Sequence, residues 1–279
     1  MKKILVPTDF SKVANNALTE AVHIARKSGA EIILLNVIEE GSSRSIRVTG
    51  EMMKGDVQEN IFMLKLINKV KGQLDDIVNN NANVKITPEL RLGNPYHGIT
   101  DIISEHKVDL VVMGTQGSSG LEELLVGSNT EKVVRHAKCA VLSVCEPMLS
   151  SETNDVVYAT NMGDDEERMV AALKTMQTMY DAKLHLTWIN TPNNFERDKL
   201  TKQRMEKFAR KHNLSNYTLN IYNDVTEEDG IISFAEDINA NMIAMITHRR
   251  TGVAHLIAGS IAEDVVNHTK RPVLTLSVD

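Results

Sequence analysis

The sequence predicts an α/β protein of two tandem domains, each built on a five-stranded parallel sheet with helices on both faces. Three observations carry this prediction: short apolar runs alternate with amphipathic segments of helical period, the same order of segments occurs twice, and a polar stretch separates the two copies. Apolar strands that alternate with helices are typical of parallel sheets covered on both faces. A length of 279 residues suits two ordinary domains.

The first copy has strand and helix patterns in strict alternation. Compact apolar runs predict strands at Lys3–Asp9, Glu31–Ile38, Val84–Leu92, Leu110–Gly114 and Ala140–Val144. Apolar residues at helical spacing predict helices near 14–25, 57–78, 95–106 and 127–137. Because a helix pattern lies between successive strand patterns, the strands are expected to be parallel.

The same order of strands recurs from about Asp155. The expected strands are Val156–Asn161, Lys183–Asn190, Tyr217–Asn223, Met242–Thr247 and Pro272–Val278. The polar, proline-containing stretch Glu146–Asn154 separates the two copies. We therefore expect one domain over residues 1–147 and a second over residues 153–279.

The first copy contains residues that the second copy lacks. Alignment of the second strands and of the later glycine loops gives offsets of 152 and 132, a difference of 20 residues. We expect the polar stretch Glu39–Asp56 to carry this surplus. It leaves the carboxyl end of a strand, where ligands of parallel sheets bind. It is interpreted either as a lid that turns Arg44 and Arg47 towards phosphates, or as a surface insertion.

Composition argues against two classes of partner. A net charge of −6 and a pI near 5.9 give no electrostatic reason to expect nucleic-acid binding. No apolar run reaches about 18 residues, so no membrane span is expected. The two cysteines, Cys139 and Cys145, flank one short strand pattern, where a disulfide is geometrically unfavourable, and they indicate a reducing, cytoplasmic setting.

A glycine-rich segment follows the fourth expected strand. Met113-Gly114-Thr115-Gln116-Gly117 comes first, and after nine intervening residues Gly127-Ser128-Asn129 opens the next helix pattern. Glycine lets a backbone approach a ligand closely, and the N–H groups at a helix start attract anions. The segment predicts a site for a phosphate-bearing ligand, with Cβ atoms missing where the ligand needs space. Ser128 and Asn129 are also good N-cap residues, so helix capping remains an alternative.

Gly114, Gly117, Gly127 and Ser128 match the pattern Gly-x2-Gly-x9-Gly-Ser/Thr. On this pattern and on the strand ILVPTD, which ends at Asp9, the first half resembles the universal stress protein family, and the whole chain resembles its tandem two-domain form. The resemblance implies a Rossmann-like fold of the adenine nucleotide alpha-hydrolase type. It also implies ATP binding in the first domain and a regulatory role in stress response.

The resemblance assigns ten residues to the nucleotide site. Those on the adenosine side are Pro7, Thr8, Asp9 and Val37, those at the ribose are Met113 and Gly114, and those at the phosphates are Gly117, Gly127, Ser128 and Asn129. A Mg²⁺ ion carried by the phosphates would lie near Asp9. The alternative role for Asp9 is that of a turn residue at the strand end.

The second copy lacks parts of this pattern. Gly114 corresponds to Ile246, Gly117 to Arg249 and Asp9 to Asn161, while Gly127-Ser128 is retained as Gly259-Ser260. A branched side chain at Ile246 would fill the space that glycine leaves, although the Arg249 guanidinium suits a phosphate. The second domain is therefore predicted not to bind ATP in the manner of the first, which leaves one site per chain.

The sequence predicts binding rather than catalysis. No Walker A sequence is present, and neither is a Gly-x-Gly-x-x-Gly dinucleotide pattern, so no lysine is placed for phosphoryl transfer. A slow ATPase or nucleotide hydrolase, and a structural module that binds another adenine compound, stay as alternatives. His248, His255 and His268 match no dense zinc spacing, so no metal site is expected.

Apolar closing strands at sheet edges tend to pair, and in the family the last strand often pairs between domains. The two halves are therefore expected to form an internal pseudo-dimer. A protein partner is expected but not identified by the sequence, and the association of two chains into a homodimer is left open.

Overall fold

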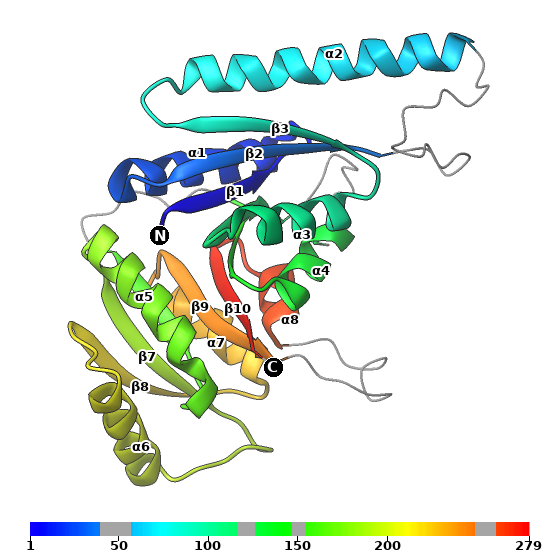
Figure 1. Ribbon diagram of the computed structural model, residues 1–279. Helices are drawn as coiled ribbons and strands as arrows, with labels where there is room; N and C mark the ends of the chain where they lie inside the picture. The colour runs from blue at the N-terminus through cyan, green and yellow to red at the C-terminus, as the bar shows by residue number, and fades with distance from the viewer. Residues whose placement is uncertain (40–56, 116–125, 147–153, 249–260, 279) are drawn as a thin grey trace.

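The computed structural model describes residues 1–39, 57–115, 126–146, 154–248 and 261–278, with side chains from residue 61 onwards in the second range. Ten strands form one sheet in the order β3-β2-β1-β4-β5-β10-β9-β6-β7-β8 (Figure 1). Neighbouring strands are parallel within each half, and β5 and β10 pair antiparallel where the halves meet. The predicted α/β class is confirmed, and the parallel sheets of the two halves join into one mixed sheet.

The elements of the first half follow the predicted order. They are β1 (Lys3–Pro7), α1 (Lys12–Ser28), β2 (Glu31–Ile38), α2 (Val57–Asn80), β3 (Ile86–Leu92), α3 (Pro95–His106), β4 (Leu110–Gly114), α4 (Ser128–His136) and β5 (Ala140–Val144). Asp9 lies beyond the end of β1, because the pairing of β1 with β2 stops at Pro7 and Leu35.

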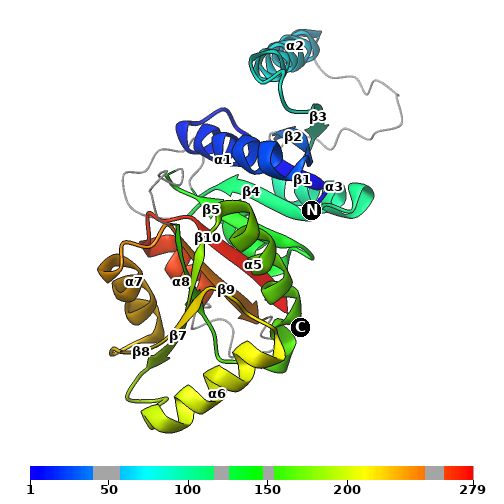
Figure 2. The same cartoon turned by 90° about the vertical axis from the view of Figure 1, so that its left-hand side faces the viewer.

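The second half repeats this order. Its elements are β6 (Asp155–Ala159), a short 3-10 turn (Asp164–Glu166), α5 (Glu167–Tyr180), β7 (Lys183–Asn190), α6 (Asp198–Lys211), β8 (Tyr217–Asn223), α7 (Glu227–Asp237), β9 (Met242–His248), α8 (Ile261–His268) and β10 (Val273–Val278). Figure 2 shows the halves following one another along the sheet, with α2 at one end and α6 at the other.

The surplus residues of the first half do not all lie in the expected loop. Helix α2 has 24 residues, whereas its counterpart α6 has 14. About half of the surplus is therefore helical, and the expectation that Glu39–Asp56 carries all of it is wrong. Residues 40–56, including Arg44 and Arg47, lie outside the described residues.

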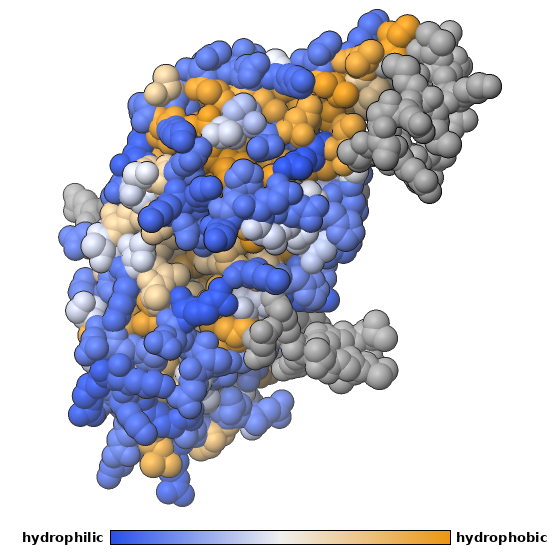
Figure 3. Space-filling model, viewed as in Figure 1, coloured by the Kyte–Doolittle hydropathy of each residue, from blue (hydrophilic) through white to orange (hydrophobic). Residues whose placement is uncertain are grey.

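Helix α2 is longer than the strand it covers. A helix of 24 residues spans about 36 Å, whereas the seven residues of β3 span about 23 Å. Val70 and Leu74 in its second half are buried against the sheet. Ile61, Phe62 and Leu64 in its first half are exposed at 48%, 68% and 58%. Figure 3 shows apolar residues gathered at this end of the molecule.

The core consists of one shared cluster and two separate ones. Alternate strand residues point to opposite faces, so Ile4 and Val6 enter one cluster and Leu5 enters another. The face covered by α1, α2, α5 and α6 holds a cluster that runs through both halves. On the other face, α3 and α4 cover one cluster and α7 and α8 cover a second.

The two halves are joined at their closing strands, as expected for a pseudo-dimer. Val273, Leu274 and Thr275 of β10 pair with Ser143, Leu142 and Val141 of β5. Of the stretch between the halves, residues 147–153 lie outside the described residues. None of the helices in the described ranges is long and apolar enough to cross a membrane.

Candidate functional site

The predicted site residues of the first domain meet at one edge of the sheet. Strands β1, β2 and β4 are adjacent and parallel, so their carboxyl ends open on the same side. The predicted residues placed at this edge are Pro7, Thr8, Asp9, Val37, Met113, Gly114, Gly127, Ser128 and Asn129. Gly117 lies outside the described residues.

The end of β2 turns backbone groups towards this edge. The Leu35 carbonyl faces β1 and accepts from the Thr8 N–H at 2.8 Å, whereas the Ile38 carbonyl faces β3 and accepts from the Gly93 N–H at 2.9 Å. Backbone groups alternate in direction along a strand. The N–H and C=O of Val37 therefore point to the β1 side, beyond the last β1–β2 pair at Pro7 and Leu35.

A tight turn after β1 fixes the direction of Asp9. The Asp9 Oδ1 accepts from the Ser11 N–H at 3.0 Å, and the Thr8 hydroxyl accepts from the Phe10 N–H at 3.0 Å. Phe10 has a φ of 63°, a left-handed conformation that few non-glycine residues adopt. Such conformations cluster at functional sites. Asp9 is thus both a turn residue and a candidate ligand contact, so the two roles are compatible.

Gly114 is required for contact between two elements of the protein itself. A Cβ at this position would lie 3.0 Å from the Val13 carbonyl carbon and 3.1 Å from the Ala14 nitrogen, in the first turn of α1. The expectation that this Cβ would enter the ligand space is therefore wrong. Glycine instead lets the end of β4 lie directly against the start of α1, beside which Asp9 is held.

The start of α4 is attached to the end of β4. The Gly127 N–H donates to the Thr115 carbonyl at 2.8 Å, and the Thr130 hydroxyl donates to the Gly114 carbonyl at 2.9 Å. Gly127 is the N-cap, so Ser128 is the first helical residue and its side chain is exposed. Within the described chain the Ser128 hydroxyl has no hydrogen bond. Helix capping therefore does not explain Ser128.

Two contacts at this edge were not predicted from the sequence, and neither was the burial of Met113. Asn36 donates from its side-chain amide to the Thr8 carbonyl at 2.7 Å. Gly98, in the first turn of α3, leaves so little room that a Cβ would lie 2.9 Å from a Val37 methyl group. Met113 is 4% exposed and belongs to the core cluster beneath the edge. A single asparagine or helical glycine has no local signal that would reveal such distant partners.

The second domain also contacts the loop that precedes Gly127. The Val126 N–H donates to the Asn267 side-chain oxygen of α8 at 3.2 Å, and Val126 packs against the core cluster beneath α7 and α8. Nearby, Arg135 of α4 binds Glu263 of α8 through two hydrogen bonds, one of them 2.7 Å from Nε to Oε1. The pKa of Arg135 is raised by the hydrogen bond to Glu263. The part of the first-domain edge formed by Val126 and the start of α4 is thus anchored to the second domain.

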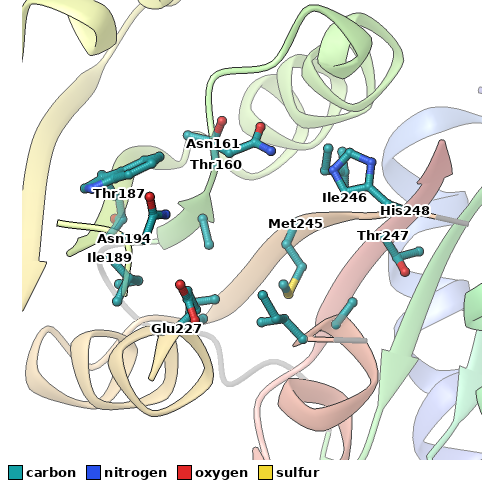
Figure 4. A pocket seen from close by; sticks show the side chains of 15 residues that line it. Thr160, Asn161, Thr187, Ile189, Asn194, Glu227, Met245, Ile246, Thr247 and His248 are labelled. Atoms are coloured by element: carbon teal, nitrogen blue, oxygen red, sulfur yellow. The ribbon is translucent and has the colours of Figure 1, made fainter. Parts of the chain in front are cut away.

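The second domain has a cavity at the equivalent edge. It has a volume of about 260 Å³ and lies at the carboxyl ends of β6, β7 and β9. Figure 4 shows Asn161, Glu227 and Met245 arranged around the same hollow. Arg249, Gly259 and Ser260 lie outside the described residues. Ile246, the counterpart of Gly114, lines this cavity.

The histidines of the second domain have separate partners. His185 bonds to Asp155 Oδ1 at 2.8 Å and to the Thr218 hydroxyl at 2.9 Å, and His268 bonds to Glu228. His255 lies outside the described residues. Among the described residues no group of three or more metal-ligating side chains gathers. Cys139 and Cys145 are both thiols, and burial raises the pKa of Cys139 to about 12.

Comparison with known proteins gives the same family twice along the chain. The sequence model of the universal stress protein family matches residues 1–144 and again residues 153–277. A universal stress protein of Methanocaldococcus jannaschii is 34% identical over 152 residues, which cover 52% of this chain and 83% of that protein. A putative universal stress protein of Staphylococcus aureus is 31% identical over 163 residues, which cover 58% of this chain and 94% of that protein.

A solved structure supports the arrangement of both halves. The universal stress protein from Archaeoglobus fulgidus aligns over 99% of this chain and 98% of its own, with a TM-score of 0.74 and 21% sequence identity. At this identity the likeness supports the fold alone. With two family matches and a repeated order of strands and helices, the chain belongs to the universal stress protein family, as a tandem two-domain member.

Proposed function

We propose that the first domain binds ATP at the strand ends and that the chain is a nucleotide-dependent regulator in stress physiology. The observation that supports this proposal is the direction of the Val37 backbone. Its N–H and C=O point to the β1 side, beyond the last β1–β2 pair and on the side of the Asp9 turn. A donor and an acceptor side by side complement the edge of an adenine ring, and a carboxylate accepts hydrogen bonds from ribose hydroxyls.

The start of α4 supports the placement of the phosphates. The first N–H groups of a helix lack partners within the helix and carry a partial positive charge. Ser128 and Asn129 lie at this start, and the Ser128 hydroxyl is exposed. Gly117 joins this group by its position in the glycine pattern. A Mg²⁺ ion bound to the phosphates would lie within reach of Asp9.

Binding rather than turnover is the proposed activity. Phosphoryl transfer needs cationic groups at the outer phosphates and a residue that positions the nucleophile. Asp9, Thr8 and Ser128 supply no cation within the described part of the site. The anchoring of Val126 by Asn267 offers a different use of the nucleotide. A ligand bound at the start of α4 can shift the contacts of α4 and Val126 with α8, by the difference in its affinity for the two arrangements.

The test uses the full-length chain. Nucleotide that remains bound after purification is identified by mass spectrometry, and ATP binding to the stripped protein is measured by isothermal titration calorimetry with and without Mg²⁺. The expected result is one ATP per chain and no phosphate release above background. Absence of ATP binding would overturn the proposal.

A slow ATPase is the remaining alternative, and the same samples address it. Phosphate release that exceeds background and disappears in Asp9→Asn would favour the enzyme. Tight binding of another adenine compound with no measurable ATP binding would favour an interaction module instead.

A further inference from the structure

The second domain keeps the backbone geometry that the first domain offers to a nucleoside. The Thr187 carbonyl accepts from the Thr160 N–H at 3.1 Å, and the Asn190 carbonyl accepts from the Asp224 N–H at 3.2 Å. By the same alternation as in β2, the N–H and C=O of Ile189 point towards β6, beyond the last pair of that ladder. Ile189 lines the cavity of about 260 Å³.

The turn after β6 is also retained. Asn161 Oδ1 accepts from the Gly163 N–H at 3.0 Å, and the Thr160 hydroxyl accepts from the Met162 N–H at 2.8 Å. Asn161 therefore holds its side chain as Asp9 does in the first domain, with an amide in place of the carboxylate. Gly230 of α7 packs against Ile189 in the way that Gly98 packs against Val37.

Apolar side chains form much of the cavity wall. They come from five elements, because Trp188 and Ile189 of β7 join Ala159, Ile231, Met245, Ile246, Ile261 and Ala262. Ligand pockets for drug-sized molecules usually measure about 300–1,000 Å³, so a cavity of about 260 Å³ suits a smaller ligand. A flat, partly apolar ring system matches such walls together with an adjacent backbone donor and acceptor.

Among the described residues, the charges that line the cavity disfavour a phosphate. Glu227, whose counterpart in the first domain is Pro95, lines the cavity and receives a hydrogen bond from Thr191 at 3.2 Å. Figure 4 shows its carboxylate turned into the hollow. Two nearby basic side chains have carboxylate partners. The Arg204 guanidinium binds Glu196 at 3.0 Å, and the His248 ring lies 3.5 Å from Asp165.

We propose that this cavity binds a phosphate-free purine, as a nucleoside or free base, with the ring edge at the Ile189 backbone and an N–H donor at Glu227. The inference extends the proposed function of the first domain, because it uses the same backbone geometry. It assigns a second ligand site to the chain. The loss of the glycine pattern and the presence of Glu227 favour a ligand without phosphate at this site.

The single tryptophan gives a signal specific to this site. The chain contains one tryptophan, and Trp188 lines the cavity. Titration of the full-length protein with adenosine, guanosine and ATP, followed by tryptophan emission, therefore reports on the second domain. Calorimetry on the same samples measures ATP binding to the first domain, so failure of either proposal is seen separately.

Adenosine or guanosine is expected to change the emission saturably, and ATP to bind about tenfold more weakly or less at this site. Glu227→Ala is expected to weaken the nucleoside by about tenfold, the usual effect of losing a hydrogen bond to a charged group. Glu227→Gln is expected to reduce the difference in affinity between ATP and the nucleoside. Partial unfolding would weaken both ligands and would not reduce this difference. Glu228→Ala, the adjacent carboxylate bound to His268, is the matched control and is expected to match the wild type.

Three results would overturn the inference. They are an unchanged emission with every nucleoside at millimolar concentration, equal or tighter binding of ATP than of nucleosides in the tryptophan signal, and wild-type titrations in Glu227→Ala. Circular dichroism of each variant verifies that the sheet is intact.

Discussion

Phe10 and Met162 occupy equivalent positions in the two domains, and both adopt left-handed backbones with φ of 63° and 62°. The residue before each of them, Asp9 or Asn161, accepts the same turn hydrogen bond at 3.0 Å. Yet the side chains around these shared turns differ. The turn backbone is thus the same in both copies while the side chains around it differ, and we propose that these side chains determine which ligand each copy binds.

The contacts between α4 and α8 show the same divergence. In a symmetric pair of domains each contact would occur twice. Arg135 and Glu263 form one such contact, and their counterparts by position are Asn267 and Glu131. Asn267 contacts the Val126 N–H. One half of the interface is thus an ion pair, and the other half holds Val126, the residue before Gly127.

The largest expected effect is on stability and tests the ion-pair half of the interface. Glu263 is 5% exposed, so Arg135→Ala leaves a carboxylate in a poorly solvated place. We expect the free energy of unfolding to fall by about 2–4 kcal/mol in urea titrations, as for partly buried ion pairs. The exposed pair Arg91–Glu105, at 2.8 Å, is the matched control, and Arg91→Ala is expected to lose less than about 1 kcal/mol. Equal losses would contradict the proposed difference.

The second prediction concerns two equivalent positions, Gly114 of β4 and Ile246 of β9. Gly114→Val introduces a Cβ that meets the first turn of α1 at 3.0 Å, so the strand end and the Asp9 turn must shift. We expect ATP affinity to fall about 100-fold, equivalent to about 2.7 kcal/mol. Ile246→Val, the matched change in the second domain, is expected to leave calorimetric ATP binding unchanged. Loss of ATP binding in Ile246→Val would mean that ATP binds to the second domain, which contradicts the proposal.

The third prediction concerns the loop half of the interface. Asn267→Ala removes the acceptor of the Val126 N–H, 3.2 Å away, and is expected to weaken ATP binding in the first domain by about three- to tenfold. The reason is that Val126, which directly precedes Gly127, loses a hydrogen bond provided by the other domain. Asn220→Ala on β8, at the far end of the sheet, is the control and is expected to have no effect. Unchanged ATP affinity in Asn267→Ala would mean that the domains do not communicate through this contact.

Much of the fold was predictable because the strands are buried on both faces. Leu110–Gly114 and Lys183–Asn190 have the predicted bounds, since uninterrupted apolar runs mark such strands. The bounds of α2 were also predicted closely, as 57–78 against the observed Val57–Asn80, but its extra length over its counterpart α6 was not recognised as part of the surplus. Pairing of β5 with β10 was predictable from their place at the ends of each copy.

The site was predictable only where a local pattern carries it. The turn at Asp9 and the start of α4 follow from short sequence signals. The contact of Gly114 with α1 and the contact of Asn267 with Val126 join residues more than 100 positions apart. They depend on how helices dock on the sheet, and no sequence spacing encodes that. The cavity of the second domain was missed for the same reason, since only the folded structure brings Glu227 to the same cavity as Ile189 and Met245.

The smallest expected effect is a difference in pH dependence between the first helices of the two domains. Ala14 in α1 corresponds to Glu166, which is 0% exposed. Burial raises the pKa of Glu166 above 4.5, although Thr160, Tyr158 and Gly163 donate hydrogen bonds to its carboxylate. A raised folded-state pKa means that the folded chain holds its proton more tightly than the unfolded chain. Its contribution to stability is therefore complete below pH 4.5 and is lost as the pH rises through the folded-state value.

Urea unfolding of Glu166→Gln between pH 4.5 and neutrality is expected to lose less stability with rising pH than the wild type does. Glu31 on β2 is the opposite case, because the hydrogen bond from Thr87 lowers its pKa, so its contribution is lost as the pH falls. Glu31→Gln should therefore flatten the acid side of the profile instead. Identical profiles for the two variants would show that the pKa of Glu166 is not raised in the folded chain.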